Sequence, residues 1–168
     1  VDMGSFYLDV IKDRQYTCQA NGRPRRSTQT AMYHIVEAMV RWIAPILSFT
    51  ADEIYGYIPG QRMESVFLEA WYVLPETHAR LKADGLDLTF WSDLLRIREA
   101  VAPELERLRV GGAIGSSLDA ELDLYVNDPL RTCLAKLGEE LRFPLLTSAV
   151  RVHDPAIRPA GAVEVTSG

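Results

Sequence analysis

The sequence predicts a mainly α-helical fold, with a helical bundle over residues 1–110 followed by a small α+β piece over residues 111–168. Apolar residues recur every three or four positions through most of the first part, which is the period of an amphipathic helix. After a glycine-rich loop, the apolar period falls to two over residues 118–126, as in a half-buried strand. With 168 residues and 48% hydrophobic content, the chain is long enough to bury a core of its own.

Two helices are expected before Pro45. The first covers about residues 2–16, where apolar side chains recur at helical spacing, and turn residues follow it at positions 21–24. The second runs from about Ser27 to Ala44, and Pro45 ends or kinks it. One apolar stripe at helical spacing predicts the buried face of this second helix. Its members are Met32, Ile35, Met39, Trp42 and Ile46.

A third helix is expected to begin at Thr50. The sequence Thr50-Ala51-Asp52-Glu53 fits a capping box, in which the hydroxyl and the Glu carboxylate satisfy exposed backbone N–H groups. Pro59-Gly60 is expected to end this helix. Residues 61–86 follow as an extended or irregular connection.

A fourth helix is expected from about Leu88 to Arg109, because six apolar residues line one face of it. Pro103 lies inside this pattern and is expected to bend the helix. The glycine-rich loop 111–117 then leads into the predicted strand over residues 118–126. Beyond that strand we expect, in order, a helix that opens at Asp128-Pro129 and short strands over residues 147–153 and 162–166.

Charge is distributed unevenly along the chain. The net charge is −5, which argues against a wholly basic nucleic-acid binder, but residues 1–45 carry six basic and four acidic side chains. A local basic patch on an acidic body can meet a polyanion at one edge. The five cations that gather between positions 12 and 26, against the single acid Asp13, are Lys12, Arg14, Arg23, Arg25 and Arg26.

These five cations are the candidate site, because recognition of an RNA backbone needs several cations spaced along a rigid edge. Other interpretations stay open: the cluster is a solvated charged surface, the cations near a helix C-terminus favour the helix dipole, or Arg26 is a structural partner of Asp9 or Asp13. Two roles are open for aromatic residues considered beside this site: they stack on unpaired bases, or they belong to the core. Those considered are Tyr16, Trp71 and Tyr72.

No catalytic, cofactor-binding or metal-binding constellation is found in the sequence. The three histidines have neither H-x-x-x-H nor H-E-x-x-H spacing. The paired acids Asp52-Glu53 and Glu139-Glu140 are helix neighbours that point to different faces, which is poor geometry for an acid/base dyad. The loop 111–117 lacks the lysine of a phosphate-binding loop and precedes a strand, so a tight helix-to-strand turn is favoured.

The cysteines and the chain ends indicate the class of protein. Cys18 and Cys133 form no C-x-x-C pair and are expected to be buried thiols in a reducing compartment. No apolar run approaches the roughly 18–20 residues that span a bilayer, and the start is not a signal peptide. We therefore expect a cytosolic protein, and both ends of the sequence suggest a fragment of a longer chain.

Several segments together resemble the anticodon-binding domain of bacterial isoleucyl-tRNA synthetases, which are class I aminoacyl-tRNA synthetases. The segments are FYLDVIKDRQYT at 6–17, RRSTQTAMYHIVEAMVRWIAPILSFTADEIYGYIPG at 25–60, FWSDLLRIREAV at 90–101, IGSSLDAELDLYV at 114–126 and LGEELRFPLLTSAVRV at 137–152. The likeness covers most of the chain, and residues 61–88 and 154–168 are the least diagnostic. Related valyl and leucyl enzymes share the A-P-I…T-x-E-I-W pattern, whereas K-D-R-Q-Y points to the isoleucyl branch.

The resemblance implies a tRNA-binding module without catalytic activity of its own. The parent family attaches isoleucine to its tRNA at the expense of ATP, and its HIGH-type and KMSKS-type signatures are absent from these 168 residues. ATP, Mg²⁺ and zinc are then expected only in other parts of the parent enzyme. The implied partners are the anticodon arm of isoleucine tRNA and the rest of the synthetase chain, and we expect a monomer that does not bind membranes.

The sequence departs from the family pattern at a few positions, and other functions stay open. Tyr55 stands where a Trp is expected, Gly112 and Ser116 replace frequent lysines, and Asp119 replaces a Glu, which puts phosphate contacts from loop 111–117 in doubt. The alternatives are an acidic helical scaffold for protein interactions and the equivalent domain of a valyl or leucyl enzyme. A stand-alone enzyme is disfavoured by the missing catalytic groups.

Overall fold

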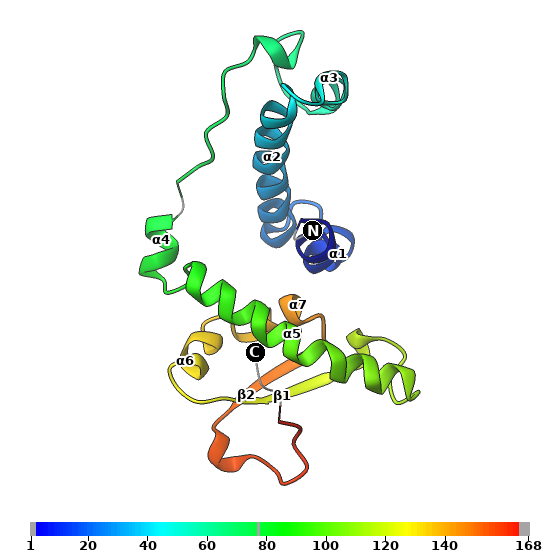
Figure 1. Ribbon diagram of the computed structural model, residues 1–168, viewed down its shortest axis with the longest axis vertical. Helices are drawn as coiled ribbons and strands as arrows, with labels where there is room; N and C mark the ends of the chain where they lie inside the picture. The colour runs from blue at the N-terminus through cyan, green and yellow to red at the C-terminus, as the bar shows by residue number, and fades with distance from the viewer. Residues whose placement is uncertain (1–2, 77, 165–168) are drawn as a thin grey trace. The chain divides into compact units, whose positions relative to one another are not determined.

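The computed structural model describes residues 3–76 and 78–164 and is mainly helical, with one small two-stranded sheet (Figure 1). This confirms the predicted fold class. Contacts divide the chain into two compact units, which we call the N-terminal unit, Ile11–Glu76, and the C-terminal unit, Val1–Val10 with Thr77–Gly168. The sequence instead suggests a boundary between residues 110 and 111, and that boundary stays a prediction.

Two helices open the chain, as expected. A π-helical turn, Met3–Tyr7, leads into α1, Leu8–Thr17, and α2 covers Arg23–Ile43. The predicted start of α2 at Ser27 is wrong by four residues. Pro24 lies in the first turn of α2, where a helix N–H has no partner within the helix, so the proline does not break it. The arginines expected to precede the helix therefore belong to its first turn.

The third helix, α3, covers Ser48–Tyr57, and the predicted capping box at Thr50 is wrong. The residue that precedes α3 is Leu47, whose side chain makes no capping hydrogen bond. Asp52 has another role: its Oδ1 accepts hydrogen bonds from Ser65 Oγ at 2.7 Å and from the Val66 N–H at 2.9 Å. These bonds hold the 3₁₀ turn Val66–Leu68 on α3. The helix stops before Pro59-Gly60, as predicted.

The apolar stripe predicted as the buried face of α2 is wrong in its second half. Met39, Trp42 and Ile46 are 45%, 40% and 82% exposed. In this second half the buried residues are Glu37, Ala38, Val40 and the following Ala44, which lie mostly on the other side of the helix. Small side chains on this face allow α3 to approach closely, and the residues that pack with Val40 and Ala44 are Ala51, Tyr55, Ile58 and Val66.

The C-terminal unit is built around one long helix. The helix α4, His78–Ala83, falls in the connection that the sequence predicts to be irregular, and α5, Leu88–Val110, matches the predicted fourth helix. Asp87 caps α5, since its Oδ1 accepts hydrogen bonds from the N–H groups of Thr89 and Phe90 at 3.1 Å. Pro103 lies inside α5, and the helix continues through it.

The strand β1, Glu121–Tyr125, pairs in parallel with β2, Ala149–His153, with Leu122 opposite Val150. The helices α6, Leu130–Ala135, and α7, Arg142–Leu145, separate the two strands, together with a 3₁₀ turn, Gly138–Leu141. The predicted strands at 118–126 and 147–153 are confirmed in shorter form. The third predicted strand, residues 162–166, is not found in its described part: residues 162–164 do not form a strand. Residues 165–166 lie outside the described residues.

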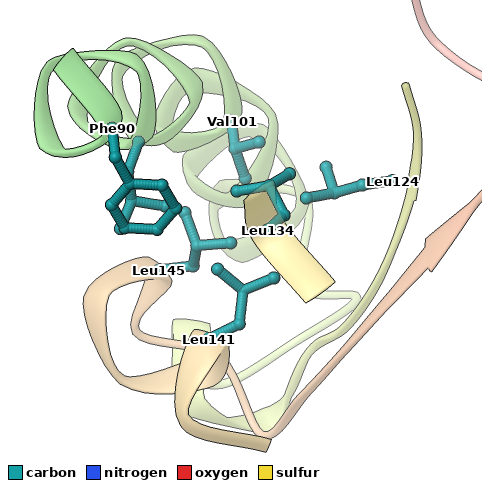
Figure 2. Close-up of a cluster of buried hydrophobic side chains, with 7 residues drawn as sticks. Phe90, Val101, Leu124, Leu134, Leu141 and Leu145 are labelled. Atoms are coloured by element: carbon teal, nitrogen blue, oxygen red, sulfur yellow. The ribbon is translucent and has the colours of Figure 1, made fainter. Parts of the chain in front are cut away.

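The core of the C-terminal unit is apolar (Figure 2). Side chains from α5, β1, the 3₁₀ turn Gly138–Leu141 and α7 surround Leu134 of α6, which is fully buried. The buried residues of this cluster are Phe90, Leu94, Val101, Leu124, Leu134, Leu141 and Leu145. The helix and strand patterns predicted for residues 88–145 therefore supply one common core.

Candidate nucleic-acid interface

All five candidate cations lie in the N-terminal unit, where α1 meets α2. Lys12 and Arg14 belong to α1, and the three remaining arginines belong to the first turn of α2. A tight turn connects the helices, with the Gly22 N–H donating to the Gln19 carbonyl at 2.8 Å. The two helices are also joined by a hydrogen bond from Gln15 Nε2 to Thr28 Oγ1, and α1 lies beside the start of α2 (Figure 1). We call the set Lys12, Arg14, Arg23, Arg25 and Arg26 the basic corner.

The cations of the basic corner differ in how they face solvent. Lys12, Arg23 and Arg26 are exposed, whereas Arg14 and Arg25 are half-buried. The Arg25 Nε is enclosed and has no hydrogen-bond partner among the described residues. Arg23 and Arg26 are three residues apart and therefore lie on one face of α2. These two arginines are the best placed to meet a ligand.

Arg23 and Arg26 form no ion pair with the part of the chain that the structure describes. Within the N-terminal unit, the salt bridge of Arg26 to Asp13, which the sequence leaves open, is therefore not formed; the alternative partner, Asp9, belongs to the other unit. The Asp13 carboxylate instead accepts a hydrogen bond from the Thr17 hydroxyl at 3.3 Å.

The charges of the basic corner destabilise the folded protein when no ligand is bound. Three arginines occupy the first turn of α2, which contains no acidic residue. The N-terminus of a helix has the positive end of the helix dipole, so cations there raise the free energy of the folded state. Gly22, at the N-cap, offers no side chain to the free N–H groups of this turn. The dipole explanation left open by the sequence therefore applies only to Arg14, in the last turn of α1.

The structure separates the three aromatic residues considered for base stacking. Tyr16 lies in the last turn of α1 and is 84% exposed. Trp71 stacks on Trp42, with ring centroids 6.3 Å apart and planes inclined by 25°. The hydroxyl of Tyr72 is hydrogen-bonded to His34 Nδ1 at 2.6 Å, and its ring packs against the guanidinium of Arg41. Tyr72 is therefore part of the protein's own structure, whereas Tyr16 is open to a ligand.

A buried ionic network is the feature that the sequence analysis misses. Glu37, 2% exposed, forms salt bridges with Arg41 and Arg62. Arg41 also pairs with Glu69 at 3.1 Å, and the Tyr55 hydroxyl donates a hydrogen bond to the Glu69 carboxylate. The spacing of Glu37 and Arg41 by four residues is the one sequence signal of this network. Arg62 and Glu69 join it from a segment expected to be irregular.

The network sets the ionisation of Glu37. Burial alone would raise the pKa of this carboxyl, but hydrogen bonds from Arg62, Arg41 and Tyr33 outweigh it and lower the pKa to about 2. The same hydrogen bond from Arg62 raises the pKa of its guanidinium. Glu37 is therefore ionised at neutral pH, and its role is to hold α2, α3 and the following segment together.

Two kinds of feature were sought among the described residues: groups of metal ligands and membrane-spanning helices. No group of three or more His, Cys, Asp or Glu side chains in residues 3–76 and 78–164 is arranged to hold a metal. None of the helices in this part of the chain combines the length and apolar character needed to cross a bilayer. Residues 111–120 connect α5 to β1, in agreement with the predicted helix-to-strand turn. Ser116 and Asp119 form a capping box at the 3₁₀ turn Ser117–Asp119 within this connection.

Comparison with known proteins assigns the family. Residues 1–124 match the family described as the anticodon-binding domain of tRNA ligase. The chain belongs to this family. It is 59% identical over 165 residues to an isoleucine–tRNA ligase of Nitrosococcus oceani, 58% identical to one of Methylococcus capsulatus and 55% identical to one of Halorhodospira halophila.

These alignments cover 93–99% of the chain but only 16–17% of each relative, so the chain spans about a sixth of the length of the curated proteins it matches. The resemblance to the isoleucyl branch is confirmed over nearly the whole chain. The chain corresponds to the anticodon-binding region, and the catalytic domain is absent from it.

Proposed function

We propose that this chain binds the anticodon arm of isoleucine tRNA, and that the basic corner contacts its phosphates. The observation that supports the proposal most directly is the first turn of α2, where Arg23 and Arg26 are exposed at an uncapped helix N-terminus without an ion pair in the described chain. Such a turn is destabilising until an anion neutralises it. A nucleic-acid backbone supplies anions at regular spacing.

Within the complete protein, the module would serve an ATP-dependent isoleucine–tRNA ligase. Docking of the anticodon arm would hold the acceptor end of the tRNA in an active site elsewhere in the enzyme. ATP, Mg²⁺ and zinc belong to those other parts in this proposal, and the cytoplasm is the compartment in which the enzyme would act. The family relationship and the coverage of a sixth of each relative support this assignment.

The experiment is a titration of the chain with isoleucine tRNA and with a non-cognate tRNA at several salt concentrations. Replacement of Arg23 and Arg26 by Gln is expected to weaken binding and to reduce the slope of log K against log salt by about one for each arginine. A matched control replaces Arg107 and Arg109, an exposed pair on α5 whose guanidiniums already pair with Glu104 and Glu106.

The slope is expected to stay unchanged in the control variant. An unchanged slope in the Arg23 and Arg26 variant would remove the basic corner as the phosphate site. Salt-sensitive binding of both tRNAs without preference would mean that discrimination lies in other parts of the enzyme. No binding at low salt would contradict the proposal and favour a protein-interaction scaffold.

A further inference from the structure

The ring of Tyr16 has no structural role that would account for its presence at the basic corner. It is 84% exposed, so it adds little to any hydrophobic core. Its hydroxyl has no hydrogen-bond partner in the described part of the chain. Lys12 lies one helical turn earlier, four residues away, and is also exposed. The aromatic ring and the ammonium group therefore lie on the same face of α1.

The last turn of α1, which contains Tyr16, is held next to the arginines of α2. The neighbouring residue Gln15 donates its side-chain hydrogen bond to Thr28, and the Gln19–Gly22 turn reverses the chain immediately after α1. Arg26 is two residues before Thr28, so a flat aromatic surface and several cations occur at one corner.

The two other most exposed aromatic residues lack this electrostatic setting. Phe49 and Tyr57, at the two ends of α3, are both highly exposed. Between Arg41 and Arg62, however, the chain contains no lysine or arginine. A polyanion would gain no charge neutralisation from that segment. Among these exposed rings, Tyr16 is therefore the one placed beside groups that bind phosphate.

We propose that Tyr16 stacks on an unpaired base while the neighbouring cations bind the adjoining phosphates. The inference rests on the proposed function and adds that the corner takes single-stranded nucleotides instead of a duplex. In a duplex the base faces are covered by their stacked neighbours, so only an unpaired base can lie on an exposed ring. Aromatic stacking and a cationic track together are the common means of binding single-stranded nucleic acid.

The test compares two RNA probes with three forms of the chain. The probes are the isolated anticodon hairpin of isoleucine tRNA and a fully paired duplex of the same stem sequence. The forms are the wild type, Tyr16→Leu, which keeps an apolar side chain without a ring, and Tyr16→Phe, which keeps the ring. Because Tyr16 is exposed, thermal unfolding of the variants is expected to match the wild type.

Tyr16→Leu is expected to weaken hairpin binding by about 5- to 150-fold, the effect of losing one base–aromatic stack. The salt slope should stay unchanged, because no phosphate contact is lost. Tyr16→Phe should bind the hairpin like the wild type, and duplex binding should not respond to either substitution.

Three results would overturn the stacking proposal: wild-type hairpin affinity in Tyr16→Leu, equal losses for hairpin and duplex, or a Tyr16→Phe variant as weak as Tyr16→Leu. The Arg23 and Arg26 variant separates this failure from failure of the proposed function. If that variant loses affinity and salt slope while Tyr16→Leu does not, the phosphate site stands and the stack is wrong. If the wild type binds neither probe at low salt, both proposals are wrong.

Discussion

The two compact units are stabilised by cores of different chemistry. In the C-terminal unit, the buried cluster around Leu134 consists of apolar side chains alone. In the N-terminal unit, the small apolar cluster around Val40 lies beside Glu37, whose buried carboxylate is shared by Arg41 and Arg62. The first core depends on apolar area and close packing. The second also depends on the complete pairing of charges that have left water.

This difference concerns specificity as well as stability. A buried ion pair contributes little net stability, because the loss of hydration offsets the attraction between the charges. Removal of one partner is costly, since the other remains buried and unpaired. We expect the network to select one arrangement of α2, α3 and the segment that contains Arg62 and Glu69, while apolar burial supplies most of the stability of the C-terminal unit.

The largest effect is expected from Glu37→Gln. The substitution keeps the size of the side chain but leaves Arg41 and Arg62 without their shared carboxylate, which should destabilise the N-terminal unit by about 3–5 kcal/mol. Hydrogen exchange measured separately for α2 and α5 would show the loss in α2 only. Equal acceleration of exchange in both helices would contradict the idea of two cores with separate dependencies.

Acid should affect the two cores unequally. The pKa of Glu37 is lowered from 4.5 to about 2, so its contribution is complete above pH 4.5 and is lost as the pH falls towards 2. At about 1.4 kcal/mol for each pKa unit, this shift corresponds to about 3–4 kcal/mol of stability.

Denaturant unfolding at a series of pH values would test the effect of acid. Glu37→Gln is the reference: it contains all the other titrating groups, so their effects cancel when its stability is subtracted from that of the wild type. The stability difference between wild type and variant should narrow between pH 4.5 and 2. A difference that does not change with pH would show that Glu37 is not the titrating group.

Leu134→Ala is the corresponding change in the apolar core. Leu134 is fully buried at the centre of its cluster (Figure 2), and the cavity left by truncation should cost about 3 kcal/mol. The loss should not depend on pH between 4.5 and 2, because no ionisable group belongs to the buried cluster. Denaturant unfolding of the wild type and of Leu134→Ala at pH 4.5 and pH 2 would measure this loss of stability. A loss that changes with pH would contradict the contrast between the apolar core and the Glu37 network.

The smallest effect is expected at the basic corner, and it has the opposite sign. Reversal of Arg23 and Arg26 to Glu places anions at the positive end of the α2 dipole and should stabilise the N-terminal unit by about 0.3–1 kcal/mol for each change. RNA binding should weaken in the same variant. The same reversal at Arg107 and Arg109, in the last turn of α5, is expected to destabilise the C-terminal unit. Melting curves at low salt would measure both changes, and a less stable Arg23 and Arg26 variant would refute the dipole argument.

The sequence predicts the C-terminal unit better than the N-terminal unit, for a physical reason. Apolar periodicity locates α5 and β1, because their buried faces consist of apolar residues. On α2 the same method selects Met39 and Trp42, which are exposed, and passes over Glu37, which is buried. A pattern of hydrophobicity cannot identify a buried glutamate whose partner, Arg62, lies 25 residues along the chain.

For the candidate site, the sequence indicates which cations cluster but not how they are arranged. The structure places the five cations where α1 meets α2, and their role as a binding site stays a prediction. Three of them belong to the first turn of α2, which the sequence analysis misses because it assigns Pro24 to the turn before the helix instead of to the helix's first turn. Arg23 and Arg26 are exposed whereas Arg25 is half-buried, and this difference in exposure cannot be predicted from the neighbouring residues in the sequence.

The stack of Trp42 on Trp71 gives the N-terminal unit an optical signature. Two indoles with centroids 6.3 Å apart and nearly parallel planes share their electronic excitation, which produces a paired signal of opposite signs in ultraviolet circular dichroism. Trp91, the third tryptophan of the chain, belongs to the C-terminal unit, where it contacts Phe90 edge to face. The paired signal would therefore report, without any label, whether the segment around Trp71 remains on α2 when RNA is added.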